Sequence, residues 1–184
     1  MSAPSTTFLQ EAITAAKGSW RLLIGRRDAP AYFDVGLQGL VSSFVALFAS
    51  IGLTLATTAL VHPGGDITSF TLVITNAVLY ATLVAASWAV LRALGKVDKF
   101  VPFIAVDNWL NAYISIVMAI LGLVGAGGDV VMFIAVVAGL AARINNARLI
   151  AELSVGQIIM LMAAQVVGVL AGMTFLGLFI PVAI

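Results

Sequence analysis

Five long apolar stretches constrain this chain more than any other feature of its sequence. They cover residues 32–61, 67–91, 101–125, 130–142 and 155–180. About 20 helical residues cross the roughly 30 Å hydrocarbon core of a bilayer, and four of the stretches exceed that length. The fourth has only 13 wholly apolar residues before Arg143. It must therefore accommodate this arginine within the membrane or cross with its help.

The overall composition excludes a soluble domain. Hydrophobic residues make up 62% of the 184 residues and charged residues only 9%, against about 45–50% and about 25% in soluble domains. A fold of this size still leaves roughly 30% of its surface exposed, which is too much for so apolar a chain. We expect an all-α polytopic membrane protein, with five transmembrane helices in residues 31–184 and a cytoplasmic segment in residues 1–30.

The basic residues predict how the helices are oriented. Every Lys and Arg lies before the first stretch, between the second and third, or between the fourth and fifth. They are Lys17, Arg21, Arg26, Arg27, Arg92, Lys96, Lys99, Arg143 and Arg148. The positive-inside rule places that side in the cytoplasm, with the C-terminus across the membrane. We expect a bacterial inner (plasma) membrane, and the net charge of +1 gives no indication of a nucleic-acid partner.

Residues 1–30 have the pattern of an amphipathic helix. Thr7 and Gln10 form a capping-box pattern at its start. Polar residues, namely Gln10, Glu11, Lys17 and Arg21, lie on one side. The apolar face consists of Phe8, Ala12, Ile13, Ala16, Trp20, Leu23 and Ile24. Such a helix either lies on the bilayer surface or packs on the cytoplasmic end of the bundle.

The third apolar stretch contains the most unusual polar residues. Asp107, Asn108 and Asn111 are spaced to share one helix face, and Asp107 is on the order of 10 Å along the helix. An acid at that depth is costly and needs a partner or a function. In the favoured structural interpretation Asp107 pairs with Arg143, and the asparagines bond across helices. In the functional one, these four residues line a cytoplasm-facing cavity for an ion, a proton or a small polar substrate.

Two further polar regions lie on the predicted cytoplasmic side. Residues 143–152 read as a polar helical elbow with an Arg148–Glu152 pair. We expect its face to be solvated, and the alternative is a docking surface for a cytoplasmic protein partner. Asp34 is expected to pair with Arg26 and Arg27 at the interface.

Small residues indicate where helices approach each other. Ala164, Gly168 and Gly172 form one small-xxx-small stripe. A second consists of Ala77, Ala81, Ala85 and Ala89. Such stripes allow close backbone contact in lipid, and we favour packing within the chain over a homo-oligomer.

We make further predictions for the polar side chains within the spans and for residues at helix ends. The Ser and Thr residues of the first stretch are expected to bond to their own helix's carbonyls, whereas Asn76 and Gln165 need partners on other helices. We expect Asp66 and Asp129 to cap the second and fourth helices, and Ser154 with Gln157 to open the fifth.

Catalytic and metal-binding patterns are missing from the sequence. It has no Cys, and its single His, His62, precedes a proline in a predicted turn. It contains no zinc-binding His pair, nucleophile elbow or Walker loop. We therefore predict no enzyme activity, no metal and no cofactor. The expected role is that of a scaffold, an assembly factor or an accessory subunit, and the alternative is a small transporter or channel using Asp107, Asn108, Asn111 and Arg143.

Local residues and topology carry a resemblance. The segments 20–28 and 32–34, with Gly39, Ser43-Phe44 and Asn108-Trp109, resemble small inner-membrane proteins of alphaproteobacteria. Five helices after a cytoplasmic N-terminus resemble the Yip family of membrane proteins. That family is implicated in membrane traffic and small-GTPase partnership through a longer cytoplasmic region. The resemblance implies an adaptor or membrane-organising protein rather than a catalyst.

Overall fold

The computed structural model describes residues 7–61, 69–126 and 128–179, and every regular element in these ranges is helical. A short helix, α1 (Phe8–Leu23), precedes five long ones. These are α2 (Leu37–Val61), α3 (Ser69–Ala93), α4 (Phe100–Leu123), α5 (Asp129–Leu149) and α6 (Val155–Phe179). Two 3₁₀ turns, Ala29–Tyr32 and Val97–Lys99, join α1 to α2 and α3 to α4. All five long helices are long and apolar enough to cross a membrane, which confirms the predicted all-α class and the five candidate spans.

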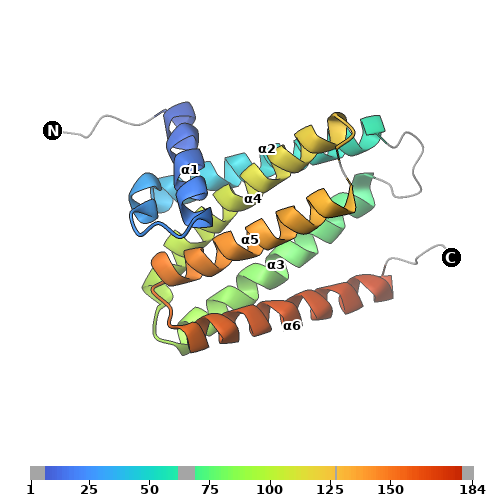
Figure 1. The fold of residues 1–184 in the computed structure, drawn as a ribbon. Helices are drawn as coiled ribbons and strands as arrows, with labels where there is room; N and C mark the ends of the chain where they lie inside the picture. The colour runs from blue at the N-terminus through green and yellow to red at the C-terminus, as the bar shows by residue number, and fades with distance from the viewer. Residues whose placement is uncertain (1–6, 62–68, 127, 180–184) are drawn as a thin grey trace.

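The long helices form a bundle in which α4 is central. α2 packs along α4, α3 packs along α6, and α5 lies beside α4 (Figure 1). α4 is also the most buried of the five candidate spans. In the others most residues are partly or fully exposed, as expected for apolar helices that face lipid. α1 crosses one end of the bundle against α4 and α5 (Figure 1).

The basic residues gather at the end of the bundle where α1 lies. The α3–α4 and α5–α6 connections meet there, because Lys99 Nζ lies 2.6 Å from Glu152 Oε1. Lys96 Nζ also donates to the Glu152 carbonyl. Each of the nine basic residues is therefore in α1, in the segment that follows α1, in these two connections or in the adjoining helix ends, whereas α6 finishes at the opposite end (Figure 1). This is the charge asymmetry on which the predicted orientation depends.

The helix ends match the sequence signals in part. Thr7 and Gln10 form the predicted capping box, and the Ser154 amide donates to Gln157 Oε1 at 3.0 Å. The prediction for Asp129 is wrong, because Gly128 occupies the N-cap of α5 and no side chain bonds there. Asp129 is instead the first helical residue, where a negative charge still favours the helix dipole. His62 and Asp66 lie outside the described residues.

The glycine stripe of α6 packs against α3, as predicted. A Cβ atom at Gly168 would lie 3.2 Å from the Thr82 carbonyl oxygen, and one at Gly172 would lie 3.1 Å from Thr82 Cγ2. On the same interface Gln165 Nε2 donates to Ser87 Oγ at 2.9 Å. The small side chains thus let α6 approach the α3 backbone closely, which is how helices associate in lipid.

Two of the predicted contacts of α3 are wrong. Its stripe of Ala77, Ala81, Ala85 and Ala89 is exposed rather than packed in the bundle. Asn76 donates to the Leu72 carbonyl of its own helix, at 2.8 Å, and not to a neighbouring helix. Own-helix bonding is confirmed for α2, where Ser50, for example, donates to the Leu47 carbonyl.

The close approach of α6 to α3 makes a testable prediction. Gly168→Val should lower the thermal unfolding temperature in detergent, because the branched side chain meets the Thr82 backbone; overpacking of this kind typically costs about 1–3 kcal/mol. Gly177→Val is the matched control, since a Cβ there meets nothing within 4 Å. Equal unfolding temperatures for the two variants would contradict the packing.

Candidate functional site

The polar residues of α4 point in two directions. Consecutive helical residues are about 100° apart, and the structure uses this difference to connect α4 to three other helices. Asp107 and Asn111 contact Arg143 of α5. Asn108 contacts Ser43 of α2 and Tyr80 of α3. The predicted single polar face is therefore divided, and Asn108 does not join the cluster around Arg143.

The Asp107–Arg143 contact confirms the pairing expected from the sequence. Arg143 Nε lies 3.5 Å from Asp107 Oδ1, and Arg143 also donates to Asn111 Oδ1 at 2.6 Å. Asn111 Nδ2 in turn donates to Asp107 Oδ2 at 3.1 Å. The three side chains close a ring of interactions between α4 and α5. Because the Asp107 side chain is only 15% exposed, its charge depends on these partners.

Asn108 is fully buried and holds α2 and α3 against α4. Tyr80 donates its hydroxyl proton to Asn108 Oδ1 at 2.7 Å, and Asn108 Nδ2 donates to Ser43 Oγ at 3.1 Å. Ser43 Oγ donates onward to the Leu40 carbonyl. Each of these three side chains has a hydrogen-bond partner among the described residues. The network therefore holds the helices together and does not present these side chains to a ligand.

The C-terminal part of α5 is held by α1. Asn145 Nδ2 donates to the Leu22 carbonyl at 2.8 Å, and Arg148 approaches the Gly25 carbonyl at 3.5 Å. The last carbonyls of a helix have no partner within it and carry partial negative charge, which suits both donors. Asn146 is fully buried, and its Nδ2 donates to the Phe103 carbonyl of α4 at 3.2 Å.

The predicted solvated elbow is therefore wrong for residues 143–149. These residues form the last two turns of α5, packed on α1 and α4. The predicted Arg148–Glu152 pair is also wrong, since Glu152 bonds to Lys99. This hydrogen bond lowers the pKa of the exposed Glu152 carboxyl.

α1 presents different residue types to the bundle and to its surroundings. Its buried face contains Glu11, Ala15, Gly18 and Leu22. Gly18 is required there, because a Cβ would lie 2.6 Å from the Phe33 ring. The exposed apolar face consists of Leu9, Ile13, Trp20 and Ile24. Packing on the bundle is thus confirmed, and the large apolar side chains remain available to lipid.

Glu11 lies on the buried face, which corrects its predicted place on the polar side. The residue is 5% exposed, and its Oε1 atom has no hydrogen-bond partner among the described residues. Burial raises the pKa of the Glu11 carboxyl, the Ser42 hydroxyl opposes that rise by hydrogen bonding, and the nearby Asp34 charge adds to it.

Asp34 does not form its predicted ion pairs. Asp34 Oδ1 accepts from the Gly36 amide at 2.8 Å. Asp28 takes the basic partners instead, pairing with Arg21 and lying 3.6 Å from Arg26 Nε.

The burial of Glu11 predicts a pH-dependent stability. A raised pKa means that the Glu11 carboxyl holds its proton more tightly in the native chain than in the unfolded chain. The stability that this difference contributes is fully present below pH 4.5, the ordinary pKa of the group, and is lost as the pH rises through the raised pKa. Glu11→Gln cannot ionise and should raise the thermal unfolding temperature in detergent at about pH 7 but not at about pH 4. Asp98→Asn, at an exposed acid, is the control. An unchanged pH profile in Glu11→Gln would contradict this.

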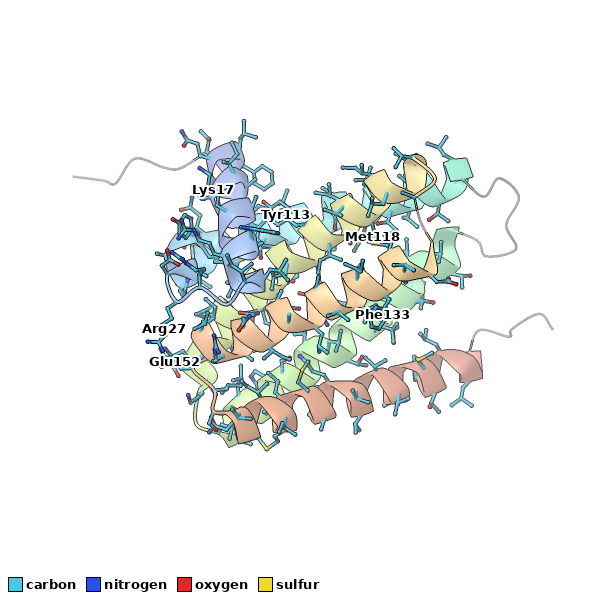
Figure 2. The ribbon with its side chains drawn as sticks, in the orientation of Figure 1. Lys17, Arg27, Tyr113, Met118, Phe133 and Glu152 are labelled. Atoms are coloured by element: carbon cyan, nitrogen blue, oxygen red, sulfur yellow. The ribbon has the colours of Figure 1, made fainter. Side chains whose placement is uncertain are left out.

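An apolar groove lies beside the polar ring, between α4 and α5. It has a volume of about 570 Å³ and runs from Leu110 to Leu121 on α4 and from Val131 to Ala142 on α5. Tyr113 and Met118 lie on its α4 side (Figure 2). Ala16, Ser19, Trp20 and Leu23 of α1 close one end. Asp107, Asn108, Asn111 and Arg143 are not among its lining residues.

Comparison with known proteins finds no match to a family model, a curated protein or a solved structure.

Several residues that build this region were not predicted from the sequence. Tyr80 and Ser43 carried no signal beyond being polar within a span. Asn145 and Asn146 lie within the helical elbow that was expected to be solvated, although two asparagines close to Arg143 on a continuing helix could have indicated a buried contact.

Removing the Asp107–Arg143 contact tests whether the pair is structural. Asp107→Asn or Arg143→Gln alone leaves one charge without its partner, and each should destabilise the fold by about 1–3 kcal/mol. The double variant should be closer to the wild-type chain than either single variant, because no uncompensated charge remains. Thermal unfolding in detergent measures all four proteins, and strictly additive losses would contradict the pairing.

Proposed function

We propose that this multi-pass membrane protein has no catalytic activity and acts as a scaffold, an assembly factor or an accessory subunit of a membrane complex. The observation that carries the proposal is how the intramembrane polar groups are used. Arg143 is bonded to Asp107 and Asn111, and Asn108 is bonded to Ser43 and Tyr80. A substrate site in a membrane protein needs polar groups facing a cavity, whereas these groups face one another.

A small transporter or channel is the second candidate, and the apolar groove argues against it. The lining of the groove is apolar except for the polar atoms of Ser19, Trp20 and Tyr113, and it omits the charged pair. A path for an ion or a proton needs polar or charged side chains along its wall. For transport, the polar ring would have to open, and this would break the contacts that join α4 to α5.

The location and the partners follow from the charge asymmetry. The nine basic residues at the α1 end support a cytoplasmic location for that end under the positive-inside rule. The N-terminus is then cytoplasmic, the C-terminus lies across a bacterial inner membrane, and a protein partner meets the cytoplasmic end. The resemblance to Yip-type topology supports the same adaptor role.

Two measurements separate the candidates. Native mass spectrometry after mild-detergent purification from native membranes should show one heterologous protein at fixed stoichiometry, both for the wild-type chain and for the Asp107→Asn/Arg143→Gln variant. Proteoliposomes loaded with a pH-sensitive dye should show no proton flux above empty vesicles.

A homo-oligomer without a second protein, together with a flux that Asp107→Asn abolishes, would overturn the proposal in favour of transport. Asp98→Asn is the matched control for the flux measurement, because this exposed acid lies in the 3₁₀ turn before α4 and is not part of the polar ring. A flux lost in Asp107→Asn but kept in Asp98→Asn would locate the path at the polar ring.

A further inference from the structure

α1 has three faces, and each of them meets different surroundings. The first is the buried face that packs on the bundle. The second closes one end of the apolar groove, and its residues are Ala16, Ser19, Trp20 and Leu23. The third is polar, and its residues are Gln10, Thr14, Lys17 and Arg21. This division is typical of a helix that contacts protein, lipid and water at once.

The groove shows which side of α1 is directed into the membrane. From α1 the groove extends along α4 and α5 toward their far ends (Figure 1), so it marks the direction of the hydrocarbon core. Lys17 is two residues before the groove-lining Ser19, and Arg21 is two residues before the groove-lining Leu23. Each basic residue therefore lies about 160° around the helix from a residue of the groove. Both basic side chains leave α1 on the side away from the hydrocarbon core, where headgroups and water lie.

A basic hollow lies on this outer side of α1. Its lining residues are Ala16, Lys17, Trp20, Arg21 and Tyr32. The Arg21 guanidinium carbon lies 4.6 Å from the centre of the Tyr32 ring, and Arg21 pairs with Asp28. Lys17, labelled in Figure 2, has no ion pair or hydrogen bond within the described part of the chain. The free positive charge of the hollow is thus the Lys17 ammonium group.

The neighbours of the hollow indicate what occupies it. Trp20 is 63% exposed and belongs both to the hollow and to the end of the groove, so it lies between the polar and the apolar side of α1. Tryptophan is favoured at this level of a membrane, between headgroups and hydrocarbon. Leu9, Ile13 and Ile24 are also exposed beside it. A free anion in water gains nothing from this apolar border, whereas a phospholipid contacts it with its acyl chains.

We propose that the basic hollow on α1 binds the headgroup phosphate of one acidic phospholipid. The Lys17 ammonium group donates to a phosphate oxygen, and the acyl chains lie in the bilayer along the exposed apolar residues of α1, outside the bundle. α1 then lies in the plane of the interface, where amphipathic helices bury their apolar side by about 5–10 Å and basic residues attract acidic lipids. The site does not depend on whether the protein is a scaffold or a transporter.

Native mass spectrometry of the purified full chain tests the ligand. The protein is equilibrated with an equimolar mixture of phosphatidylglycerol and phosphatidylcholine that have identical acyl chains, and the bound lipid is identified by mass. Phosphatidylglycerol should be retained in preference to phosphatidylcholine. Lys17→Gln should lower this preference about fivefold, the contribution of one basic residue beside an acidic lipid. Arg27→Gln removes the same charge from an exposed residue that does not line the hollow, and it should leave the preference unchanged.

Spin labels on single cysteines test the orientation of α1 in vesicles of the same two lipids. The chain has no cysteine of its own, and Ile13 and Thr14 are both exposed on α1. Ile13 lies on the apolar side and Thr14 on the polar face. The label in Ile13→Cys should therefore be relaxed more by oxygen, which concentrates in the bilayer, and the label in Thr14→Cys more by a water-soluble nickel complex.

Four results would overturn the site. Equal retention of the two lipids by the wild-type chain would show that the headgroup charge is not recognised. An unchanged preference in Lys17→Gln would exclude Lys17 as the phosphate ligand. Equal losses in Lys17→Gln and Arg27→Gln would mean that the lipid responds to the general positive charge of this end and not to the hollow. Equal access of the nickel complex to both labels would show that α1 does not lie in the interface.

Discussion

The contact of Arg143 with Asp107 and Asn111 decides whether α5 can cross the membrane. The 13 apolar residues before Arg143 rise about 20 Å, which is too short for a roughly 30 Å core. With Arg143 neutralised by α4, the helix continues for 21 residues, or about 32 Å. An unpaired arginine at that depth is costly. Whether the chain crosses the membrane four or five times therefore depends on this one interaction, and so does the side of the membrane on which α6 begins.

The placement of α1 follows from the extension of α5. The polar end of α5 offers Asn145 and Arg148 as donors, and the carbonyls of Leu22, in the last turn of α1, and of Gly25, just beyond it, accept them. This contact positions α1 across α4 and α5, where its small buried face meets the bundle and its large apolar residues stay exposed. The groove and the basic hollow exist because α1 lies there. α5 thus connects the polar ring on α4 with the placement of α1.

Sequence patterns predicted what depends on composition and period. The five spans, the capping box of α1, the Asp107–Arg143 pair and the α6 stripe follow from hydropathy, spacing and matched helix positions. The patterns did not predict which polar side chain of a helix faces a neighbouring helix, because this depends on the rotation of the helix about its own axis. Asn108 points away from Asp107, and Glu11 faces the bundle, because neighbouring helices select which polar residue is turned inward. Periodicity alone carries no information on that choice.

Single-cysteine labelling measures most directly whether α5 crosses the membrane. The chain has no cysteine, so each introduced thiol reacts alone. Ala126→Cys and Glu152→Cys are at exposed positions beyond the two ends of α5. We predict that a membrane-impermeant maleimide labels Ala126→Cys in intact cells and labels Glu152→Cys only after permeabilisation. Labelling of both positions from the same side would contradict a complete crossing and, with it, the role assigned to Arg143.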